Sequence, residues 1–352
     1  MDIKRNVRFL EELVARRSPS GFEKECVKKV FDTYCSRFAE KVYSDKIGNS
    51  VFSIGTGNTT ILLSGHIDEL GMQVIKIESS GMLVAYPLSI DKKVLPGSKV
   101  EVQTKNGNWI TGIIGKKPVH AESGEDRSSV SKVSDLTIDL GFTTAEEVKE
   151  AGIKIGSFVV YERNYDDINF GKSQVLAPGL DDKAGVYISV MAGEILSKYP
   201  DVLKKYKILI AATTQEEVGL RGATVLAQNI KPDVSIDFDV TPSNDFGVKS
   251  EEWGEVKVGN GPVIEYGPDK SIRICEEIEK IAETGDIKIQ PVVTGRPGGT
   301  NTDMIQLFGG DCETAHIALP IRNLHTPVEI CSWEDIDNTI KLVCELIISE
   351  KL

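Results

Sequence analysis

The chain has 352 residues, of which 40% are hydrophobic and 27% charged, as is usual for a globular protein large enough for two domains. Its 41 Lys and Arg against 53 Asp and Glu give a net charge of −12, which argues against a nucleic-acid partner because phosphate backbones attract clustered Lys and Arg. No run approaches the roughly 18 apolar residues of a membrane span, so no membrane association is expected.

The first 17 residues form a charged amphipathic pattern with Ile3, Val7, Leu10 and Val14 at helical spacing. This segment lacks the apolar centre of a signal peptide. The six cysteines are scattered and include no CxxC pair. That pattern is typical of reduced thiols, and we expect a cytoplasmic protein.

Helix and strand signals follow in turn along the first part of the chain. The pattern at 21–34 predicts a second helix, and 51–65 predicts two strands joined by a Gly-Asn turn. From residue 72 to 165 the sequence changes to short β-rich runs separated by turn signals. Among these, KNGN at 105–108 is a strong hairpin signal. We predict a small β-barrel or β-sandwich over 72–165.

One short helix is expected to interrupt that β-rich region. Thr144 and Glu147 are placed as a capping box, and Gly152 is placed to stop the helix.

From about residue 170 strands alternate again with helices. Helices are expected after DDKAG, over 271–285 and from Ser332 onward, with strands over 206–212, 234–240 and 316–321. This alternation predicts an α/β fold with a mostly parallel sheet covered by helices. Because such patterns flank the β-rich region on both sides, we predict one α/β domain of residues 1–71 plus 166–352, with the domain 72–165 inserted.

Apolar segments of this α/β region end five times in His, Asp or Glu. The donors at these ends are His66 with Asp68, Asp181 with Asp182, Glu216 with Glu217, Asp239, and His325. In open α/β sheets ligands bind beyond the carboxyl ends of the strands. Five converging ends would therefore place two imidazoles and several carboxylates in one pocket. So many buried acids would raise one another's pKa, a problem that a divalent cation removes.

Imidazole nitrogens and carboxylate oxygens are the ligand set of catalytic zinc, and of cobalt or manganese where oxygen predominates. Five protein ligands suit two metals about 3.5–4 Å apart better than one. Residues i and i+2 of an extended segment face the same way, so Asp68 can hydrogen-bond His66 and fix its tautomer. Glu216 and Glu217 point differently, so one can bind metal while the other acts as general base.

Several of these motifs also have a purely structural interpretation. An acidic pair after a strand is most often a helix N-terminus, and DD before KAG is equally a helix cap. Asp237 lies two residues before Asp239 and competes with it for the ligand role. The coincidence of all five strand ends favours a metal site. The other two histidines, His120 and His316, are interpreted as structural.

The motifs GHIDELG, LDDKAG, TQEEVGLRGA, FDVTP and RNLHTPVE occur in this order along the chain, preceded by SPSGFE at 18–23 and with KKPVH at 116–120. With them the sequence resembles the M42 metallopeptidases, which include glutamyl and tetrahedral (TET) aminopeptidases and chains often labelled endoglucanase. The stretch TGRPGGTNTDMI at 294–305 resembles the family's GGTDA stretch but carries an additional Asn301-Thr302.

The resemblance implies a zinc-peptidase-type α/β domain, an inserted β-barrel-like domain used in assembly, and two divalent ions per subunit, zinc with cobalt or manganese as alternatives. The metal ligands carried over by motif are His66, Asp181, Glu217, Asp239 and His325. Asp181 would bridge the ions, and its peptide bond to Asp182 would be cis. Glu216 would be the general base, and Asp68 would orient His66. A homo-oligomer, dimer-based and extending to a dodecamer, is also implied.

The predicted function is metal-dependent removal of the N-terminal residue from short peptides. A deacylase of small amides would use the same centre, whereas an endoglucanase-type glycosidase would use two carboxylates without needing histidines. A non-enzymatic assembly protein would bind metal without turnover. Arg221, Arg296 and Arg322 are candidates for recognising an acidic N-terminal side chain, although such arginines more often form structural ion pairs.

Overall fold

The computed structural model describes residues 1, 3–116, 120, 136–163, 168–245 and 254–352. The chain forms two compact units. The first unit comprises residues 1–68, 166–324 and 328–352. The second comprises residues 69–165 together with the turn 325–327. Residues 117–119 of the KKPVH motif lie outside the described residues. Among the helices that are described, none is both long and apolar enough to cross a membrane. All six cysteines have free thiols.

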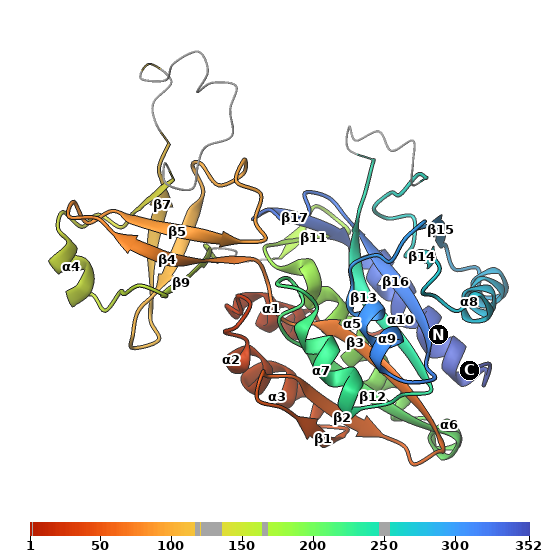
Figure 1. Ribbon diagram of the computed structural model, residues 1–352. Helices are drawn as coiled ribbons and strands as arrows, with labels where there is room; N and C mark the ends of the chain where they lie inside the picture. The colour runs from red at the N-terminus through yellow and green to blue at the C-terminus, as the bar shows by residue number, and fades with distance from the viewer. Residues whose placement is uncertain (2, 117–119, 121–135, 164–167, 246–253) are drawn as a thin grey trace. The chain divides into compact units, whose positions relative to one another are not determined.

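An eight-stranded mixed sheet forms the centre of the first unit (Figure 1). In spatial order its strands are β1 (Glu40–Ser44), β2 (Ser50–Ile54), β12 (Tyr206–Thr213), β3 (Thr59–His66), β13 (Val234–Pro242), β16 (Glu313–Ile321), β14 (Val263–Tyr266) and β15 (Gln290–Val293). The central strands β12, β3, β13 and β16 are parallel, and antiparallel pairs lie toward the edges. The parallel strands are long apolar runs because both faces of the sheet are covered.

The strands on either side of the Gly-Asn turn, β2 and β3, are not neighbours in the sheet. Strand β12 lies between them, antiparallel to β2 and parallel to β3. The sequence predicts both strands correctly, but the pairing brings in a strand about 150 residues further along the chain.

Helices cover both faces of this sheet. Helix α5 (Leu180–Leu196) contacts β3 and β13, and α10 (Trp333–Ile348) packs on α5. A Cβ at Gly65 would lie 2.6 Å from the backbone of α5, so only glycine allows that approach. The neighbouring Ser64 points to the opposite face, where α9 (Asn301–Phe308) contacts β13 and β16 and packs against α7 (Arg221–Asn229).

The remaining helices of this unit are α1 (Val7–Ala15), α2 (Lys24–Cys26), α3 (Asp32–Cys35), α6 (Pro200–Lys205) and α8 (Ile272–Gly285). The helix predicted over 21–34 is present as α2, a π-helical segment Val27–Phe31 and α3 in succession. Helix α1 begins only at Val7, where the Asn6 side chain accepts a hydrogen bond from the Phe9 N–H. Ile3 therefore lies outside the helix but still packs against the core. A small sheet consists of β10 (Asn169–Phe170), β11 (Gln174–Ala177) and β17 (Glu329–Ser332).

The second unit is a closed barrel rather than a sandwich. Its strands, in order around the barrel, are β4 (Gly71–Ile77), β5 (Leu83–Leu88), β8 (Thr137–Asp139), β7 (Trp109–Ile114), β6 (Lys99–Gln103) and β9 (Phe158–Tyr161). The predicted hairpin joins β6 to β7, with Gly107 at φ 81°.

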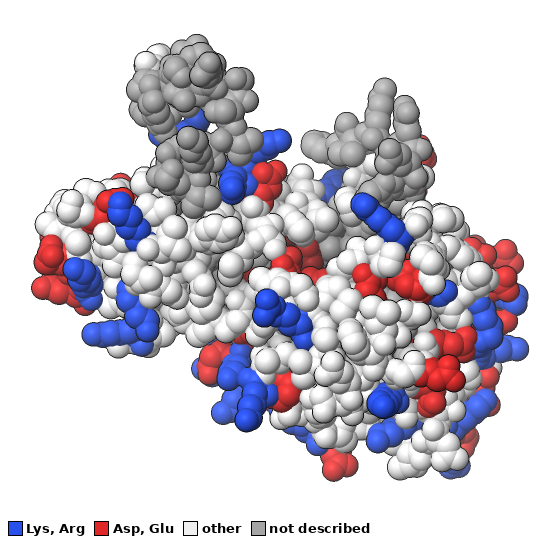
Figure 2. Space-filling model, in the orientation of Figure 1, with Lys and Arg blue, Asp and Glu red and all other residues white. Residues whose placement is uncertain are grey.

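The predicted short helix is α4 (Ala145–Glu150). The Thr144 hydroxyl accepts the Glu147 N–H, and the Glu147 carboxylate accepts the Thr143 N–H. Charged side chains of both signs are interspersed over the described residues of the face in Figure 2.

Candidate metal centre

The parallel strands bring the predicted donors to one edge of the sheet. His66 is the last residue of β3 and pairs with Thr213, the last residue of β12. Glu216 and Glu217 follow β12 after two intervening residues, and β13 carries Asp239 near its carboxyl end. Parallel strands share the direction of their carboxyl ends, so these segments converge as the sequence predicts.

The imidazole of His66 lies among carboxylates from three other segments. Its Nε2 atom is 3.0 Å from Oδ1 of Asp181, 3.8 Å from Oε2 of Glu216 and 3.8 Å from Oδ1 of Asp239. The His66 side chain is only 1% exposed. These separations are those of groups that could share one cation.

Asp68 fixes the tautomer of His66 through its backbone. The Nδ1 atom of His66 lies 3.1 Å from the carbonyl oxygen of Asp68 and 3.5 Å from its carboxylate. A carbonyl oxygen can only accept, so Nδ1 carries the proton and donates it. Nε2 is then the ring nitrogen that faces the carboxylates and is placed to bind a metal.

Two further predicted donors, Asp181 and His325, have unusual backbone geometry. His325 follows β16 and adopts φ 63°, a conformation that is uncommon for a residue other than glycine. The peptide bond between Asp181 and Asp182 is cis, as the resemblance implies.

The electrostatics of the cluster reflect its excess of acids. Burial raises the pKa of Glu216 to about 9 and that of Asp239 to about 7, and the neighbouring carboxylates add to the effect. Burial and the charge of Asp181 raise the pKa of Glu217 well above its usual value. Burial alone would lower the pKa of His66, but the carboxylates around it, led by Glu216, raise it well above the usual range. The cluster therefore contains more carboxyl groups than it can keep ionised without additional positive charge.

This donor set fits a divalent cation. Imidazole nitrogen and carboxylate oxygens from separate segments lie within 4.8 Å of one another in overlapping groups, and such N and O ligands suit zinc, cobalt or manganese. A bound cation would favour the ionised carboxylates that burial and mutual repulsion otherwise oppose.

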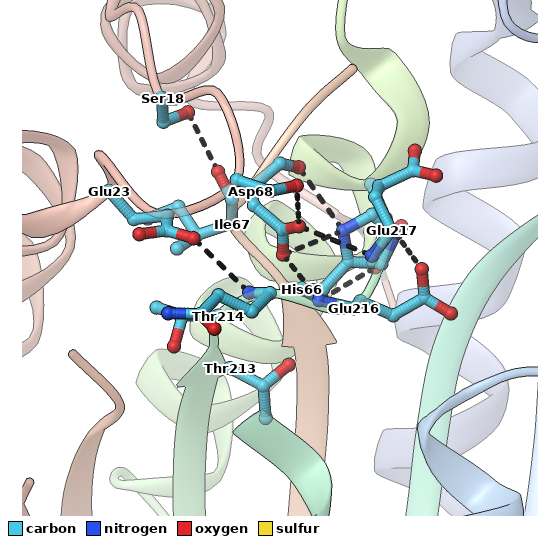
Figure 3. A network of polar contacts seen from close by, with 12 residues as sticks. Ser18, Glu23, His66, Ile67, Asp68, Thr213, Thr214, Glu216 and Glu217 are labelled. Carbon is cyan, nitrogen blue, oxygen red and sulfur yellow. Dashed lines mark hydrogen bonds and ion pairs between the residues drawn. The ribbon is translucent and has the colours of Figure 1, made fainter. Parts of the chain in front are cut away.

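The segment that carries the acid pair is held by side chains from elsewhere in the chain (Figure 3). The Asp68 carboxylate accepts the backbone N–H groups of Glu216, at 3.0 Å, and of Glu217, at 3.2 Å. It also accepts the hydroxyl of Ser20 at 2.7 Å. The sequence suggests that Asp68 orients His66, but it does not show that the Asp68 carboxylate also accepts the backbone N–H groups of the two glutamates.

Asp182 has a different part from its neighbour Asp181. Its carboxylate accepts the backbone N–H of His66 at 3.0 Å and that of Gly185 at 2.8 Å. The capping interpretation of this acidic pair therefore applies to Asp182, which also ties α5 to the end of β3.

Asp237 makes different contacts from Asp239, although ligand atoms of the two carboxylates lie within 4.8 Å of each other. Its carboxylate accepts the Ser64 hydroxyl at 2.7 Å and lies 3.5 Å from the Asn301 amide nitrogen, whereas Asp239 approaches His66. Asn301, the first residue of α9 and one of the two residues added to the Gly-rich stretch, is thus buried as part of a polar layer. No sequence pattern marks this role.

The other two histidines differ in their surroundings. His120 is exposed. His316 is buried in β16, where Nδ1 lies 2.9 Å from a carboxylate oxygen of Glu265. Ligand atoms of His316, Asp237 and Asp239 also lie within 4.8 Å of one another.

The three candidate arginines have ordinary local contacts. Arg322 pairs with Asp245 at 2.6 Å, and the Arg221 side chain donates to the carbonyl oxygen of Val218. Arg296 is exposed in the stretch before α9. Arg322 thus makes the structural ion pair that is the commoner role of such a residue.

Comparison with known proteins gives consistent results. The family model of the M42 glutamyl aminopeptidases matches residues 48–342. A lysyl aminopeptidase of Pyrococcus furiosus is 27% identical over 343 residues, which cover 96% of each chain. The crystal structure of a TET aminopeptidase from Thaumarchaeota archaeon SCGC AB-539-E09 is 30% identical, with a TM-score of 0.89 over 97% of this chain and 96% of that chain.

The TET1 peptidase of Pyrococcus horikoshii, which can assemble into a tetrahedron or a large octahedral shell, is 31% identical. Its TM-score is 0.82 over 97% of this chain and 98% of that chain. With the family model covering most of its length, the chain belongs to the M42 glutamyl aminopeptidase family and is a hydrolase.

Proposed function

We propose that the chain is a metal-dependent aminopeptidase that hydrolyses the N-terminal peptide bond of short peptides. The observation that carries the proposal is the position of His66, whose Nε2 lies within 3.8 Å of carboxylates from Asp181, Glu216 and Asp239. Buried acids crowded around an imidazole at the carboxyl edge of a parallel sheet support a metal site. Membership of an aminopeptidase family supports peptides as substrates.

We propose that two divalent ions, zinc with cobalt or manganese as alternatives, would be held by His66, Asp181, Glu217, Asp239 and His325. When bound, such a pair supplies Lewis-acid polarisation of the scissile carbonyl and a lower pKa for the attacking water.

In this proposal Glu216 is the general base. Its carboxylate takes a proton from the attacking water and gives it to the leaving amine. Its raised pKa, about 9 without a cation, falls once a cation neutralises the cluster, and the carboxylate can then accept the proton. Asp68 keeps the His66 tautomer through its carbonyl oxygen and holds the backbone of the acid pair through its carboxylate.

The test is Glu216→Gln, assayed with amino-acid p-nitroanilides in the presence of zinc or cobalt. Turnover is expected to fall by at least about 1,000-fold, because proton transfer contributes about 10²–10⁴-fold and the amide also loses its charge. Both metals are expected to remain bound, as measured by metal analysis of the purified variant. A variant that keeps wild-type turnover would refute the assignment of Glu216 as base.

The alternative activities predict different results with the wild-type protein. A deacylase would prefer N-acyl amino acids to the p-nitroanilides. A glycosidase would cleave glucans and survive a chelator. A protein that uses metal only for assembly would bind it and turn over neither substrate.

We also propose that the protein is a cytoplasmic homo-oligomer. The TET1 relative that assembles into large shells and the free state of all six thiols support this. Large apolar side chains at least half exposed on the barrel unit offer surface for such contacts, namely Ile75, Tyr86, Ile113 and Ile155. Light scattering coupled to size exclusion would distinguish a dimer from a dodecamer.

A further inference from the structure

The turn at 18–23 has the sequence SPSGFE and contacts the edge of the sheet where the proposed donors lie. The proposed mechanism uses none of the residues of this turn. Figure 3 shows Ser18 directed at Ile67 and Glu23 directed at the backbone just after Thr214. The Ser18 hydroxyl donates to the Ile67 carbonyl at 2.8 Å. The Glu23 carboxylate oxygen Oε1 accepts the Gln215 N–H at 3.2 Å.

The contact belongs to an unusual series of backbone hydrogen bonds. The N–H groups of the four residues 214–217 each donate to a side-chain oxygen from a distant part of the chain. The acceptors are in turn Asn49 Oδ1 at 3.0 Å, Glu23 Oε1 at 3.2 Å, Asp68 Oδ1 at 3.0 Å and Asp68 Oδ2 at 3.2 Å. These residues belong to neither helix nor strand, so the side-chain acceptors take the place of secondary structure in satisfying this backbone.

The conformation of the segment also needs external support. Gln215 has φ 55°, a left-handed conformation that a residue with a Cβ adopts only when its surroundings determine it. Glu23 holds this residue, which lies directly before the acid pair.

Glu23 is a buried carboxylate whose hydrogen bonds connect two separate segments of the chain. It is 1% exposed, and the same Oε1 atom accepts the Gly21 N–H at 2.7 Å. Burying a carboxylate costs free energy unless charge or hydrogen bonds compensate. Here one oxygen joins the turn at 18–23 to the loop that carries Glu216 and Glu217.

We propose that Glu23 is a positioning residue of the hydrolytic centre, supported by Ser20, whose hydroxyl holds the Asp68 carboxylate. By fixing the Gln215 amide, Glu23 sets the direction in which Glu216 and Glu217 leave the sheet. The proposal rests on the proposed function for the roles of those two glutamates.

The test compares Glu23→Ala and Glu23→Gln with a matched control, Asp335→Ala. Asp335 is also a fully buried carboxylate, and it accepts two backbone N–H groups, those of Gly259 at 2.6 Å and Gly261 at 2.7 Å. Asp335 lies in α10, and neither that helix nor the segment 259–261 carries a proposed donor. Each variant would be measured for thermal stability, cobalt affinity by chelator competition, kcat and KM, and hydrogen exchange of 213–218.

Glu23→Ala is expected to lower kcat and cobalt affinity by about 10-fold or more, the usual effect of removing a residue that orients metal ligands. KM should stay within about three-fold, and hydrogen exchange of 213–218 should accelerate. Glu23→Gln should recover most of the loss, because its amide oxygen can accept the same N–H groups. Asp335→Ala should lose comparable stability but keep the kcat and cobalt affinity of the wild type.

Wild-type kcat and cobalt affinity in folded Glu23→Ala would overturn the proposal, as would equal losses in Asp335→Ala. If Glu23→Ala does not fold, Ser20→Ala is the deciding variant. It is expected to lose about three-fold in kcat and in cobalt affinity, and wild-type values of both would contradict the proposal. A wild-type protein without aminopeptidase activity would refute the proposed function, whereas cobalt affinity and hydrogen exchange would still decide the role of Glu23.

Discussion

Two buried clusters of charged residues in the first unit contain carboxyl groups whose pKa values are shifted in opposite directions. At the strand ends, burial raises the pKa of Glu216 to about 9 and that of Asp239 to about 7. Beside β16, burial alone would also raise the pKa of Glu265, but His316 and Lys270 lower it below its usual value. Lys270 lies 3.7 Å from Glu265 and 2.6 Å from Asp269.

The difference is the supply of positive charge, because both clusters are removed from water. The cluster around Glu265 contains an ammonium and an imidazole of its own. The cluster around His66 has several carboxylates for each imidazole, and cations from outside would supply the missing positive charge. The contrast favours the cluster around His66 as the proposed metal site.

The largest expected effect comes from removing divalent cations. Dialysis against a chelator should lower p-nitroanilide turnover by at least about 1,000-fold, equivalent to roughly 4 kcal/mol of activation free energy. Turnover should return on adding zinc or cobalt. If the chelated protein kept its activity, the strand-end cluster would not need an external cation, and the contrast with the Glu265 cluster would disappear.

The next effect concerns the cluster that contains its own cations. Lys270→Met removes the ammonium from two buried carboxylates, and breaking such a pair typically costs about 3–5 kcal/mol of stability. Urea denaturation would measure the loss. The control is Lys280→Met, whose partner Glu277 forms an i,i+3 pair on the surface and which should lose much less stability, because water screens an exposed ion pair. Equal small losses in both variants would contradict the assignment.

The smallest effect is a difference in pH dependence between metal-free and metal-loaded protein. Glu216 and Asp239 have raised pKa values in the folded state without metal, so their stabilising contribution is fully present below the ordinary values near 4. It is lost as the pH rises through about 7 and then about 9. The free energy of unfolding of the metal-free protein should therefore fall between pH 5 and 9. Metal-loaded protein should show a weaker fall, since a cation favours the ionised carboxylates.

Denaturant titrations at several pH values would measure this difference. Glu265 contributes in the opposite sense, since its pKa is lowered. Its stabilisation is present above about pH 4.5 and is lost as the pH falls further. Parallel curves for metal-free and metal-loaded protein would contradict the predicted coupling.

Donors such as His66, Glu216 and Asp239 could be proposed because they lie at the ends of long apolar runs that are visible in the sequence. Asp181 differs, because it lies at the start of α5 and not after a strand of the main sheet. The barrel could be predicted from short runs with turn signals. Strands β14 and β15 are not predicted, because each has only four residues and neither belongs to a series of β-rich runs separated by turn signals. Helix α9 is not predicted either, because it begins inside a Gly-rich stretch that resembles a loop.

The contacts around the acid pair also could not be predicted. Glu23 meets the Gln215 amide across 192 positions of sequence, and a periodic pattern carries no information about which distant backbone group a side chain will reach. The motif SPSGFE was visible, but its partner was not.

The hydrogen bonds from the backbone of residues 214 and 215 to Asn49 and Glu23 have a consequence for the design of truncated or chimeric variants. A shortened version starting after residue 23 would keep every proposed donor atom and most of the hydrophobic interior. It would still lack the oxygen that receives the Gln215 amide, and the two glutamates would leave the sheet along a different path. Deleting or replacing the amino-terminal residues would therefore change the position of Glu216 and Glu217 in the proposed hydrolytic centre.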